Sequence, residues 1–432
     1  MMEKTEKIAI LEKLVSIDTT DQAEGVIADY LADLFTQHGI QTEKVASKPG
    51  RENLVAYLGE ATDKVLAVTG HMDVVSIGDR SKWTSDPFTL TARDGKLFGR
   101  GATDMKSGLA ALVIAMIELH DQNVPLNGQI KLLATVDEEK NETGAQTLTA
   151  QGYADNLTAL LVAEPSGVDK QALANSTDKF PTEMVQKLLA ANQTNEQHFL
   201  IFAHNGSLDF KVTATGKTAH SSMPELGINA IDHLLAYYNR QKQYFNQKHP
   251  IDDVLGDIVP VTTLINGGEQ INSVPGHAEL TCRVRTTPAL TGDQVIADLN
   301  AIIAELNQQT DMNLALTVIN NQPPVKSNPQ APFIQSVQKI GAQKLSQAYP
   351  LMHVAGGTDA AHFAKNNPNL PVAVVGPGND TSHMIDEYVD EERLLCQESG
   401  HKSTSKFDFQ FKLLNLIFGG RSFSPVQILK TL

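Results

Sequence analysis

Histidine and acidic side chains stand directly after several apolar runs of this chain. Two histidines and three carboxylates from such a set would offer nitrogen and oxygen donors together, a mixture that suits Zn²⁺ or Co²⁺. One catalytic zinc takes three protein ligands and a water, so five ligands exceed its needs. Two ions that share a bridging carboxylate use all five and form a hydrolytic centre, with the ions about 3.5–4 Å apart. The candidate side chains are those of His71, Asp73, Asp104, Asp137, Glu138, Glu139, Glu164 and His383.

Buried strands are expected to deliver most of these side chains. Each strand is a short apolar run, and the acids or the histidine follow where the run ends. Adjacent strand ends of a parallel sheet lie about 5 Å apart, and ligands bind at that edge of open α/β sheets. Asp104 instead precedes an apolar segment, Leu109 to Leu119, that predicts a buried helix. The expected strands are Val65–Thr69, Ile130–Val136, Ala159–Ala163 and Val372–Val375.

Each of these features alone has an ordinary structural explanation. A His-x-Asp pair such as His71 and Asp73 is usually a surface or capping feature. Adjacent acids usually lie in a solvated loop or at a helix N-terminus, where the helix dipole favours them. A late histidine such as His383 is more often a hydrogen-bonded structural residue. Random placement would rarely put such groups after four buried strands, so the joint pattern favours a metal site.

The composition limits the classes of protein to consider. The 432 residues are 41% hydrophobic and 20% charged, which is typical of a globular enzyme with room for two domains. The net charge of −15 argues against a nucleic-acid partner or an anionic membrane surface. Two cysteines, Cys282 and Cys396, imply no disulfide framework. The N-terminus has no signal-peptide pattern, and no apolar run approaches the ~20 residues of a membrane span. We therefore expect a cytoplasmic protein.

The alternation of buried strands and amphipathic helices predicts an α/β fold, with a mainly parallel sheet and helices on both faces. From Leu208 onward the pattern changes to strands with one buried face, where Leu208 and Phe210 alternate with polar residues. The order there is β-α-β-β-α-β, that of a ferredoxin-like α+β domain. We expect this domain to span residues 207–322, inserted between two catalytic parts at 1–206 and 323–432.

Apolar spacing predicts the other elements. In the outer parts we expect helices at Ile8–Leu14, Val26–His38, Pro181–Ala191 and Phe333–Leu345, and a strand at Asn53–Leu58. In the insert we expect strands at Leu208–Ala214, Val261–Ile265, Ala278–Val284 and Leu314–Ile319, with helices at Asn229–Lys242 and Asp293–Leu306. Two stretches have no assigned role: residues 169–200, and the tail after Cys396 with its apolar segment Phe411–Phe418.

Five stretches together resemble the M20 metallopeptidase family. They are His71-Met72-Asp73-Val74-Val75, Gly99–Lys106, Asp137-Glu138-Glu139, Ala163-Glu164-Pro165 and the late His383, and the resemblance covers roughly residues 8–395. It implies a zinc-peptidase-like catalytic domain that binds two divalent ions, Zn²⁺ or Co²⁺. By this resemblance His71 and Glu164 would hold one ion, Glu139 and His383 would hold the other, and Asp104 would bridge them.

The resemblance also implies roles for groups that do not bind metal. Asp73 would orient His71 through the second ring nitrogen. Glu138 would be the general base, taking a proton from the attacking water and passing it to the leaving amine. The adjacent acids then divide two tasks, because Glu139 binds metal while Glu138 stays free to accept a proton.

The inserted domain resembles the lid and dimerisation domain of the family, which implies a homodimer through this domain. The loop 216–222 matches the loop whose histidine, here His220, stabilises the tetrahedral oxyanion across a dimer interface. Without the resemblance, His220 would be only a polar loop residue and Arg283 an exposed strand residue. The other matches are Asn272 and Arg283, for the polar and carboxylate groups of the substrate, and Gly357, Thr358 and Asn379, for the acyl pocket.

Within the family the likeness is greatest to succinyl-diaminopimelate desuccinylases and acetylornithine deacetylases. We expect an amidohydrolase acting on a small N-acyl amino acid, and favour cleavage of N-succinyl-LL-2,6-diaminopimelate to succinate and LL-diaminopimelate, a step of lysine biosynthesis. Acetylornithine deacetylase, aminoacylase and dipeptidase are the alternatives within the family. A non-catalytic metal-binding protein on this fold is the alternative from another class, although neither Glu138 nor His220 is needed merely to hold metal.

Overall fold

The computed structural model describes residues 2–20, 22–175, 182–192, 194–309 and 311–395. The described residues divide into two compact units. Unit 1 takes those of Met1–Phe202, Ser327–Met352 and Thr358–Leu432, and unit 2 takes Ala203–Lys326 and His353–Gly357. Cys396 and the segment Phe411–Phe418 lie outside the described residues. Within the described ranges, no helix has both the length and the apolar character needed to cross a membrane.

Unit 1 is built around a mixed sheet. Its central strands β6, β3, β7 and β19 run parallel, whereas the strands on both flanks pair antiparallel. The mainly parallel sheet is thus confirmed at the centre, and the strand expected at Asn53–Leu58 belongs to an antiparallel flank. The order is β1 (Gln41–Lys48), β2 (Arg51–Leu58), β6 (Gln129–Thr135), β3 (Val65–His71), β7 (Ala159–Val162), β19 (Val372–Val374), β10 (Leu200–His204) and β17 (Val325–Lys326), with β18 (Leu351–Val354) also paired to β10.

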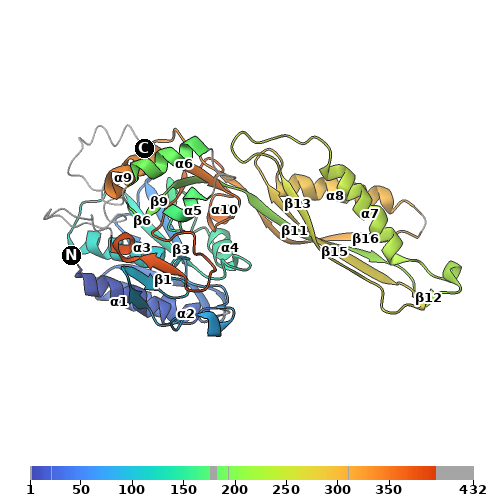
Figure 1. The fold of residues 1–432 in the computed structure, drawn as a ribbon, viewed down its shortest axis with the longest axis horizontal. Coiled ribbons are helices and arrows are strands. Elements are labelled where there is room, and N and C mark those ends of the chain that lie inside the picture. Colours follow the sequence, from blue (N-terminus) through green and yellow to red (C-terminus); the bar gives the residue numbers. More distant parts are fainter. Residues whose placement is uncertain (1, 21, 176–181, 193, 310, 396–432) are drawn as a thin grey trace. The chain divides into compact units, whose positions relative to one another are not determined.

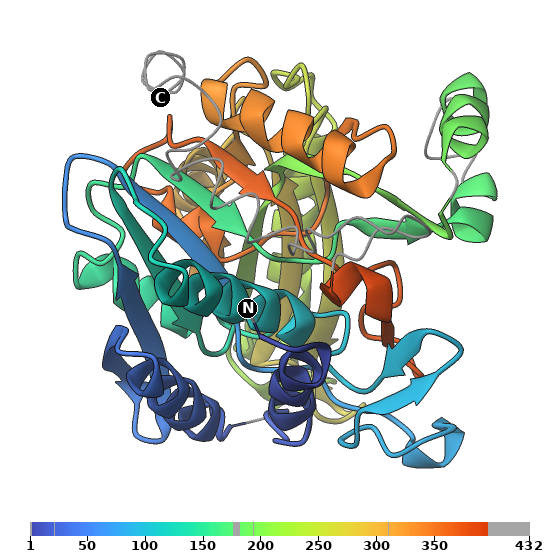
Figure 2. The same ribbon diagram turned by 90° about the vertical axis from the view of Figure 1, so that its left-hand side faces the viewer.

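Helices cover the central strands. The chain passes from β3 through α3 (Lys106–Asp121) to β6, then through α4 (Thr143–Ala150) to β7 on the other side of β3. Right-handed crossovers in opposite directions put α3 and α4 on opposite faces of the sheet (Figure 1). Helix α1 (Lys4–Val15) packs on α3, and α2 (Glu24–Gln37) packs on β2. In Figure 2, α3 (teal) and α9 (Pro332–Leu345, orange) cross the same side of this sheet.

Strand β3 and helix α3 are both almost entirely buried, as their apolar sequences predict. All seven residues of β3 are buried, as expected for a strand covered on both faces. The residues of α3 from Lys106 to Leu119 are buried too, so the helix expected at Leu109–Leu119 is confirmed. Gly108 is required where α3 meets the segment after β7, because a Cβ there would lie 1.9 Å from the carbonyl oxygen of Ala163. This close approach brings the start of α3 beside Glu164.

Shorter elements complete unit 1. A small antiparallel sheet has the order β20, β5, β4, and β8 pairs with β9. The helix expected at Pro181–Ala191 is present as α6, within the described residues. The remaining bounds are η1 (Arg80–Lys82), β4 (Thr91–Arg93), β5 (Lys96–Phe98), β8 (Gly167–Asp169), α5 (Lys170–Ala174), α6 (Thr182–Ala191), β9 (Glu196–His198), α10 (Ala360–Phe363), β20 (Tyr388–Asp390) and α11 (Glu391–Leu395).

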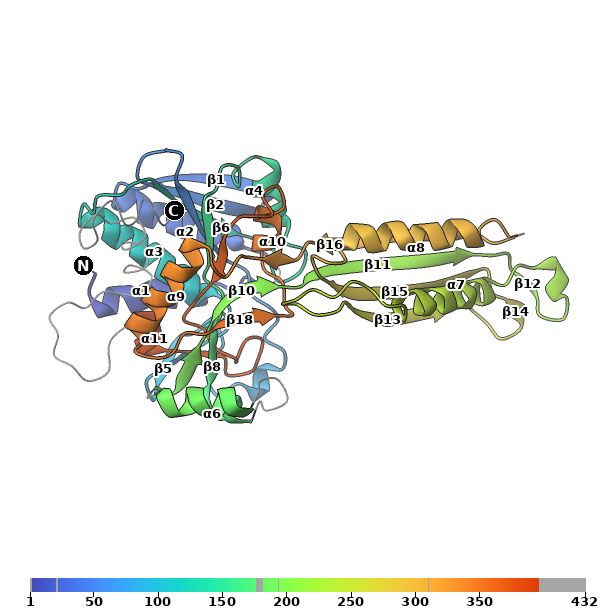
Figure 3. The same cartoon turned by 90° about the horizontal axis from the view of Figure 1, so that it is seen from above.

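Unit 2 has the ferredoxin-like order predicted from the sequence. Its antiparallel sheet runs β13, β15, β11, β16, so the first and third strands lie in the middle. Two short strands, β12 and β14, pair with each other and lie at one end of the unit (Figure 3). The bounds are β11 (Gly206–Thr215), β12 (Ala219–His220), η2 (Pro224–Leu226), α7 (Ala230–Phe245), β13 (Val259–Gly267), β14 (Ser273–Val274), β15 (His277–Thr286), α8 (Gly292–Leu306) and β16 (Leu314–Gln322).

The sheet of unit 2 buries one face and leaves part of the other open. On β11, Leu208 and Phe210 pack in a core with residues of α7 and α8, as the alternating pattern predicts. On β13, four apolar side chains are instead more than half exposed: Val259, Val261, Leu264 and Ile265. Contiguous exposed apolar residues on a strand often mark a surface that binds another protein.

Candidate metal centre

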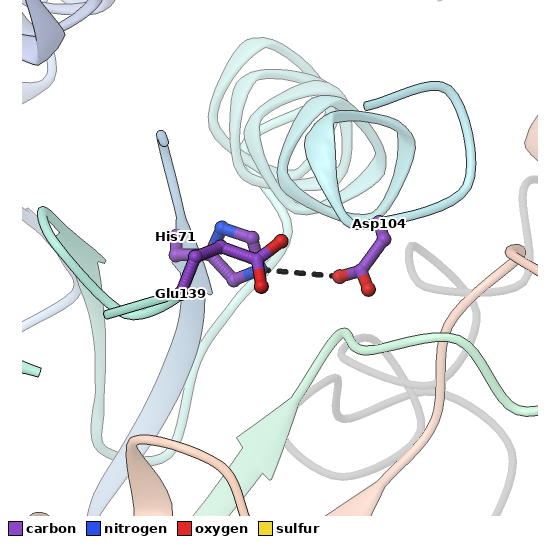
Figure 4. A group of neighbouring side chains, drawn as sticks. All are labelled: His71, Asp104 and Glu139. Carbon is purple, nitrogen blue, oxygen red and sulfur yellow. Dashed lines mark hydrogen bonds and ion pairs between the residues drawn. The ribbon is translucent and has the colours of Figure 1, made fainter. Parts of the chain in front are cut away.

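Three neighbouring strands and one helix bring the predicted side chains together. His71 is the last residue of β3, and Glu139 follows β6, which is the parallel neighbour of β3. Glu164 follows β7, the parallel neighbour on the other side. Asp104 comes from the loop that leads into α3, as Figure 4 shows together with His71 and Glu139. The edge at the carboxyl ends of the strands therefore holds the site, as expected.

The two oxygens of Asp104 face two different histidines. The Nε2 atom of His71 lies 3.2 Å from Oδ1 of Asp104 and 3.4 Å from Oε1 of Glu164. The Nε2 atom of His383 lies 3.3 Å from Oδ2 of Asp104 and 3.0 Å from Oε2 of Glu139. The five side chains thus form two halves, one around each histidine, with Asp104 common to both.

Among the described residues, two groups of side chains could each hold a cation. One is His71, Asp104 and Glu139, and the other is His71, Glu138 and Glu164; in each group the donor atoms lie within 4.8 Å of one another. Glu138 is therefore close enough to His71 and Glu164 to act as a metal ligand itself, which is an alternative to its expected role as a free base. The donors are imidazole nitrogens and carboxylate oxygens, the combination expected for zinc or cobalt.

The electrostatics of the site favour added positive charge. Burial, followed by repulsion from neighbouring carboxylates, raises the pKa of Glu164 well above its usual range, and burial likewise raises the pKa of Glu138 and of Glu139. Hydrogen bonds with Asp104 and Glu139 raise the pKa of His383 to about 10. In the metal-free protein, bound protons thus reduce the repulsion among these buried carboxylates. A divalent cation can replace those protons when it binds.

One buried oxygen tests whether the side chains fit a metal. Oε1 of Glu139 is buried and has no hydrogen-bond partner among the described residues. Leaving a buried carboxylate oxygen without a partner is costly, so native proteins rarely do it without a ligand or ion. Together with the nitrogen and oxygen donors around Asp104, this oxygen makes the residues fit a pair of divalent ions.

Asp73 contacts both sides of the site, but not in the way expected. Nδ1 of His71 lies 2.9 Å from the backbone carbonyl oxygen of Asp73 and 3.6 Å from its carboxylate. The carboxylate of Asp73 instead accepts the backbone N–H groups of Glu138 and Glu139, both at 3.1 Å. The expected contact to the ring is thus made mainly by the backbone of Asp73, whereas its side chain fixes the turn that carries the two glutamates.

Comparison with known proteins identifies the family. Residues 67–398 match the model of peptidase family M20/M25/M40, which is more than half of the chain. The chain belongs to the M20 family. A protein of Staphylococcus aureus named probable succinyl-diaminopimelate desuccinylase is 35% identical over 90% of this chain and 94% of its own length. An acetylornithine deacetylase of Photorhabdus laumondii is 27% identical, over 87% of this chain and 88% of its own length.

Solved M20 structures share the fold. An M20 metallo-carboxypeptidase of Sulfolobus solfataricus gives a TM-score of 0.70 at 15% identity, covering 96% of this chain and 99% of its own. A dinuclear metal-binding M20 peptidase of Bacillus subtilis gives a TM-score of 0.65 at 14% identity, covering 99% of both chains. The chain is therefore a hydrolase of a metal-dependent family that acts on amide bonds.

The side chains expected to bind substrate lie in both units. His220, Asn272, Arg283 and Gly357 belong to unit 2, whereas Thr358, Asn379 and the expected metal ligands belong to unit 1. Within unit 2, β12 and β14 bring His220 next to Asn272, because His220 pairs with Ser273 and the N–H of Ser221 bonds to the carbonyl of Asn272. These two predicted residues therefore share one end of unit 2.

His220 is held in one tautomer. Its Nδ1 atom accepts hydrogen bonds from the backbone N–H of Ser222 at 3.1 Å and from the Ser222 hydroxyl at 2.8 Å. A neutral imidazole that accepts at Nδ1 carries its proton on Nε2. His220 is exposed, so an Nε2–H group is available as a donor.

Other predicted residues are already engaged. The guanidinium of Arg283 binds both carboxylate oxygens of Asp209, each at 2.7 Å. The amide of buried Asn379 donates to Glu196 at 2.8 Å and to the carbonyl of Tyr388 at 3.2 Å. Their expected roles in substrate binding stay predictions.

The two residues expected to line the acyl pocket, Gly357 and Thr358, have close neighbours. A Cβ at Gly357 would lie 2.1 Å from the side-chain oxygen of Gln322, so a larger residue there would require the Gln322 side chain to move. Thr358 is buried, and its hydroxyl accepts the N–H of Ala360 at 3.3 Å. The expected contact of both residues with the acyl group stays a prediction.

Sequence analysis missed two buried pairs of side chains in unit 1. Residues 169–200 were assigned no role, but Glu196 and His198 are fully buried there, with His198 Nε2 3.3 Å from Glu196. Glu387 and Arg100 form a buried ion pair beside the loop of Asp104. For Arg100 the signal in the sequence is its place in the stretch Gly99–Lys106, and for Glu387 it is the position four residues after His383.

Proposed function

We propose that this M20 hydrolase removes the succinyl group from N-succinyl-LL-2,6-diaminopimelate, using two Zn²⁺ or Co²⁺ ions. The proposal of two-metal hydrolysis is supported by the position of Asp104, whose two oxygens face two different histidines, His71 at 3.2 Å and His383 at 3.3 Å. The choice of substrate is supported by the 35% identical relative named probable succinyl-diaminopimelate desuccinylase. Such a reaction would contribute to lysine biosynthesis.

We assign the metal ligands in two sets that share Asp104. His71 and Glu164 would hold one ion, and Glu139 and His383 would hold the other. When bound, the two ions act as Lewis acids toward the scissile carbonyl and the attacking water.

Glu138 would then move the proton. Its carboxylate takes a proton from the attacking water and delivers it to the nitrogen of the leaving amine. In the metal-free protein, burial raises the pKa of Glu138, whereas bound cations nearby would favour its charged, proton-accepting form. The backbone of Glu138 is fixed by its N–H bond to Asp73, so the side chain has a defined place beside the ligand Glu139.

The substrate assignment can be tested with a panel of amides. Metal-loaded protein should hydrolyse N-succinyl-LL-2,6-diaminopimelate with a higher kcat/KM than N-acetylornithine, other N-acyl amino acids or dipeptides. Release of succinate and of the free amine would be measured. Glu138→Gln protein purified by the same procedure would report contaminating activity. If N-acetylornithine were hydrolysed faster, the proposed substrate would be wrong, and the activity named for the 27% identical relative would be favoured instead. No hydrolysis of any amide would favour a metal-binding protein without catalysis.

We further propose that His220 stabilises the oxyanion in the active site of a partner subunit. The Nε2–H donor left by its bonds to Ser222 supports this role, and the exposed apolar residues of β13 suit a protein interface. His220→Ala should lower kcat by a factor of about 10²–10³, since one oxyanion donor contributes roughly that much. Metal content should stay unchanged, and His277→Ala, an exposed histidine of the same unit, should retain full activity.

Mixing two inactive proteins tests whether the site is shared. In a dimer of His220→Ala with Glu138→Gln chains, one site would combine an intact Glu138 with the intact His220 of the other chain. Activity should return once subunit exchange has been confirmed by mass. If mixed dimers form and activity stays absent, His220 does not serve a neighbouring subunit.

A further inference from the structure

A buried ion pair beside the metal centre has no part in the reaction proposed above. Arg100 is 1% exposed and Glu387 is fully buried, and Nη1 of Arg100 bonds to Oε2 of Glu387. Burying two charges costs desolvation energy that their attraction offsets only in part, so such a pair is weak support for stability by itself. Its other contacts indicate what it does.

Glu387 holds the backbone at Asp104. Its Oε1 atom accepts the N–H groups of Thr103 and Asp104, both at 2.8 Å. Hydrogen bonds to a charged acceptor are roughly twice as strong as neutral ones. Asp73 contacts the other ligand loop in the same way, with its carboxylate on the N–H groups of Glu138 and Glu139. A carboxylate that binds no metal thus fixes each of the two loops.

Arg100, which is paired with Glu387, contacts the backbone of two further loops. Its Nη2 atom donates to the carbonyl of Ser76 at 3.1 Å, and the carbonyl of His383 lies at 3.5 Å. Ser76 follows His71 in the loop after β3. The backbone carbonyl of Glu387 also accepts the N–H of Gly99 at 3.0 Å. The pair therefore joins the loops that carry His71, Asp104 and His383, although Arg100 and Glu387 are 287 residues apart.

We propose that Arg100 and Glu387 are positioning residues, which set the place of Asp104 relative to His383 and thereby the affinity for the ion that Asp104 and His383 share. The proposal rests on the metal centre proposed above. Removing a hydrogen-bond partner of a ligand typically lowers metal affinity 10- to 100-fold. Glu387→Gln keeps an oxygen that can accept the two N–H groups but removes the charge that binds Arg100, so it should weaken Co²⁺ binding by about that factor.

A second buried ion pair of unit 1 provides a matched control. Lys7 and Glu118 are 3.0 Å apart with side chains 9% and 1% exposed. Glu118 also accepts the backbone N–H of Met2, and among the described residues neither side chain hydrogen-bonds to a loop that carries a metal ligand. Both Glu118→Gln and Glu387→Gln should lower the unfolding temperature of the metal-free protein, but Glu118→Gln should leave the Co²⁺ affinity unchanged. Affinity would be measured by competition with a chelator, and the visible spectrum of bound Co²⁺ would report the geometry of the ligands. Glu387→Gln alone should change that spectrum.

The outcomes separate the inference from the metal centre itself. A wild-type protein that binds no Co²⁺ would reject the metal centre, and the inference with it. Wild-type affinity and spectrum in a folded Glu387→Gln protein would reject the inference alone, as would an equal loss of affinity in Glu118→Gln. If Glu387→Gln does not fold, Arg100→Lys keeps a positive charge but loses the fork that reaches Ser76 and His383, and it should also weaken Co²⁺ binding. Unchanged binding in Arg100→Lys would overturn the proposal.

Discussion

Replacing Glu138 with glutamine should lower kcat by a factor of about 10²–10⁴ while the protein keeps its metal ions. Glutamine has nearly the same shape, and the contact of Glu138 with Asp73 is made by its backbone N–H, which the substitution leaves in place. What is lost is the ability to accept a proton. Turnover of the amide substrate and metal content of the same samples are the two measurements required.

The neighbouring glutamate provides the matched comparison. Oε2 of Glu139 lies 3.0 Å from His383, and its other oxygen is buried without a partner among the described residues. Glu139→Gln should therefore lose metal as well as activity. Glu138 also lies within reach of His71 and Glu164, so the geometry allows it to be a ligand instead of a base. Loss of metal from Glu138→Gln, or normal turnover with metal retained, would each exclude its role as general base.

The metal centre could be predicted because it lies at the ends of buried strands. A run such as Val65–Thr69 is apolar at every position since both faces of β3 are covered, and the end of the run marks the edge of the sheet. Whatever polar side chain follows must then project from that edge. His71, Glu139 and Glu164 come from three adjacent strand ends, and their convergence follows from strand spacing alone.

The flanks of the sheet were less accessible to sequence reasoning. Strand β1 buries only Val45 fully, so its sequence has no apolar run that could predict a strand. The direction of β2 depends on its pairing with β1 and β6, which burial patterns do not specify. By contrast, the ferredoxin-like order of unit 2 was predictable because its strands alternate on one buried face and its two helices are amphipathic.

The groups that hold the ligands in place could not be predicted, because their partners are distant in the chain. Glu387 contacts the backbone at Asp104 across 283 residues, and no pattern around either residue reports that contact. The same applies to Arg283 and Asn379, whose side chains bind Asp209 and Glu196. A motif gives the type of residue at a position, whereas its free hydrogen-bonding capacity depends on what the fold brings against it.

Replacing Asp104 with alanine should prevent binding at both halves of the metal centre and reduce activity further than Glu138→Gln does. Its two oxygens face His71 and His383 at 3.2 and 3.3 Å, so neither half keeps its full set of ligands without them. Metal analysis after reconstitution should approach two ions per chain in the wild type and fall well below one in Asp104→Ala. The loss arises because each ion would be left with two protein ligands, one fewer than the three that catalytic zinc sites use.

The pKa of His383 in metal-free protein would show whether Asp104→Ala acts locally on the metal centre. Hydrogen bonds with Asp104 and Glu139 raise the pKa of His383 to about 10, so losing Asp104 should lower that pKa toward its usual value of about 6.5. An NMR titration of His383 in folded Asp104→Ala protein would detect this change without any metal. Glu164→Ala should leave the pKa of His383 nearly unchanged, because Glu164 pairs with His71 in the other half. If Asp104→Ala instead bound one ion tightly with full activity, Asp104 would not be a bridge, and the second ion would not be needed for hydrolysis.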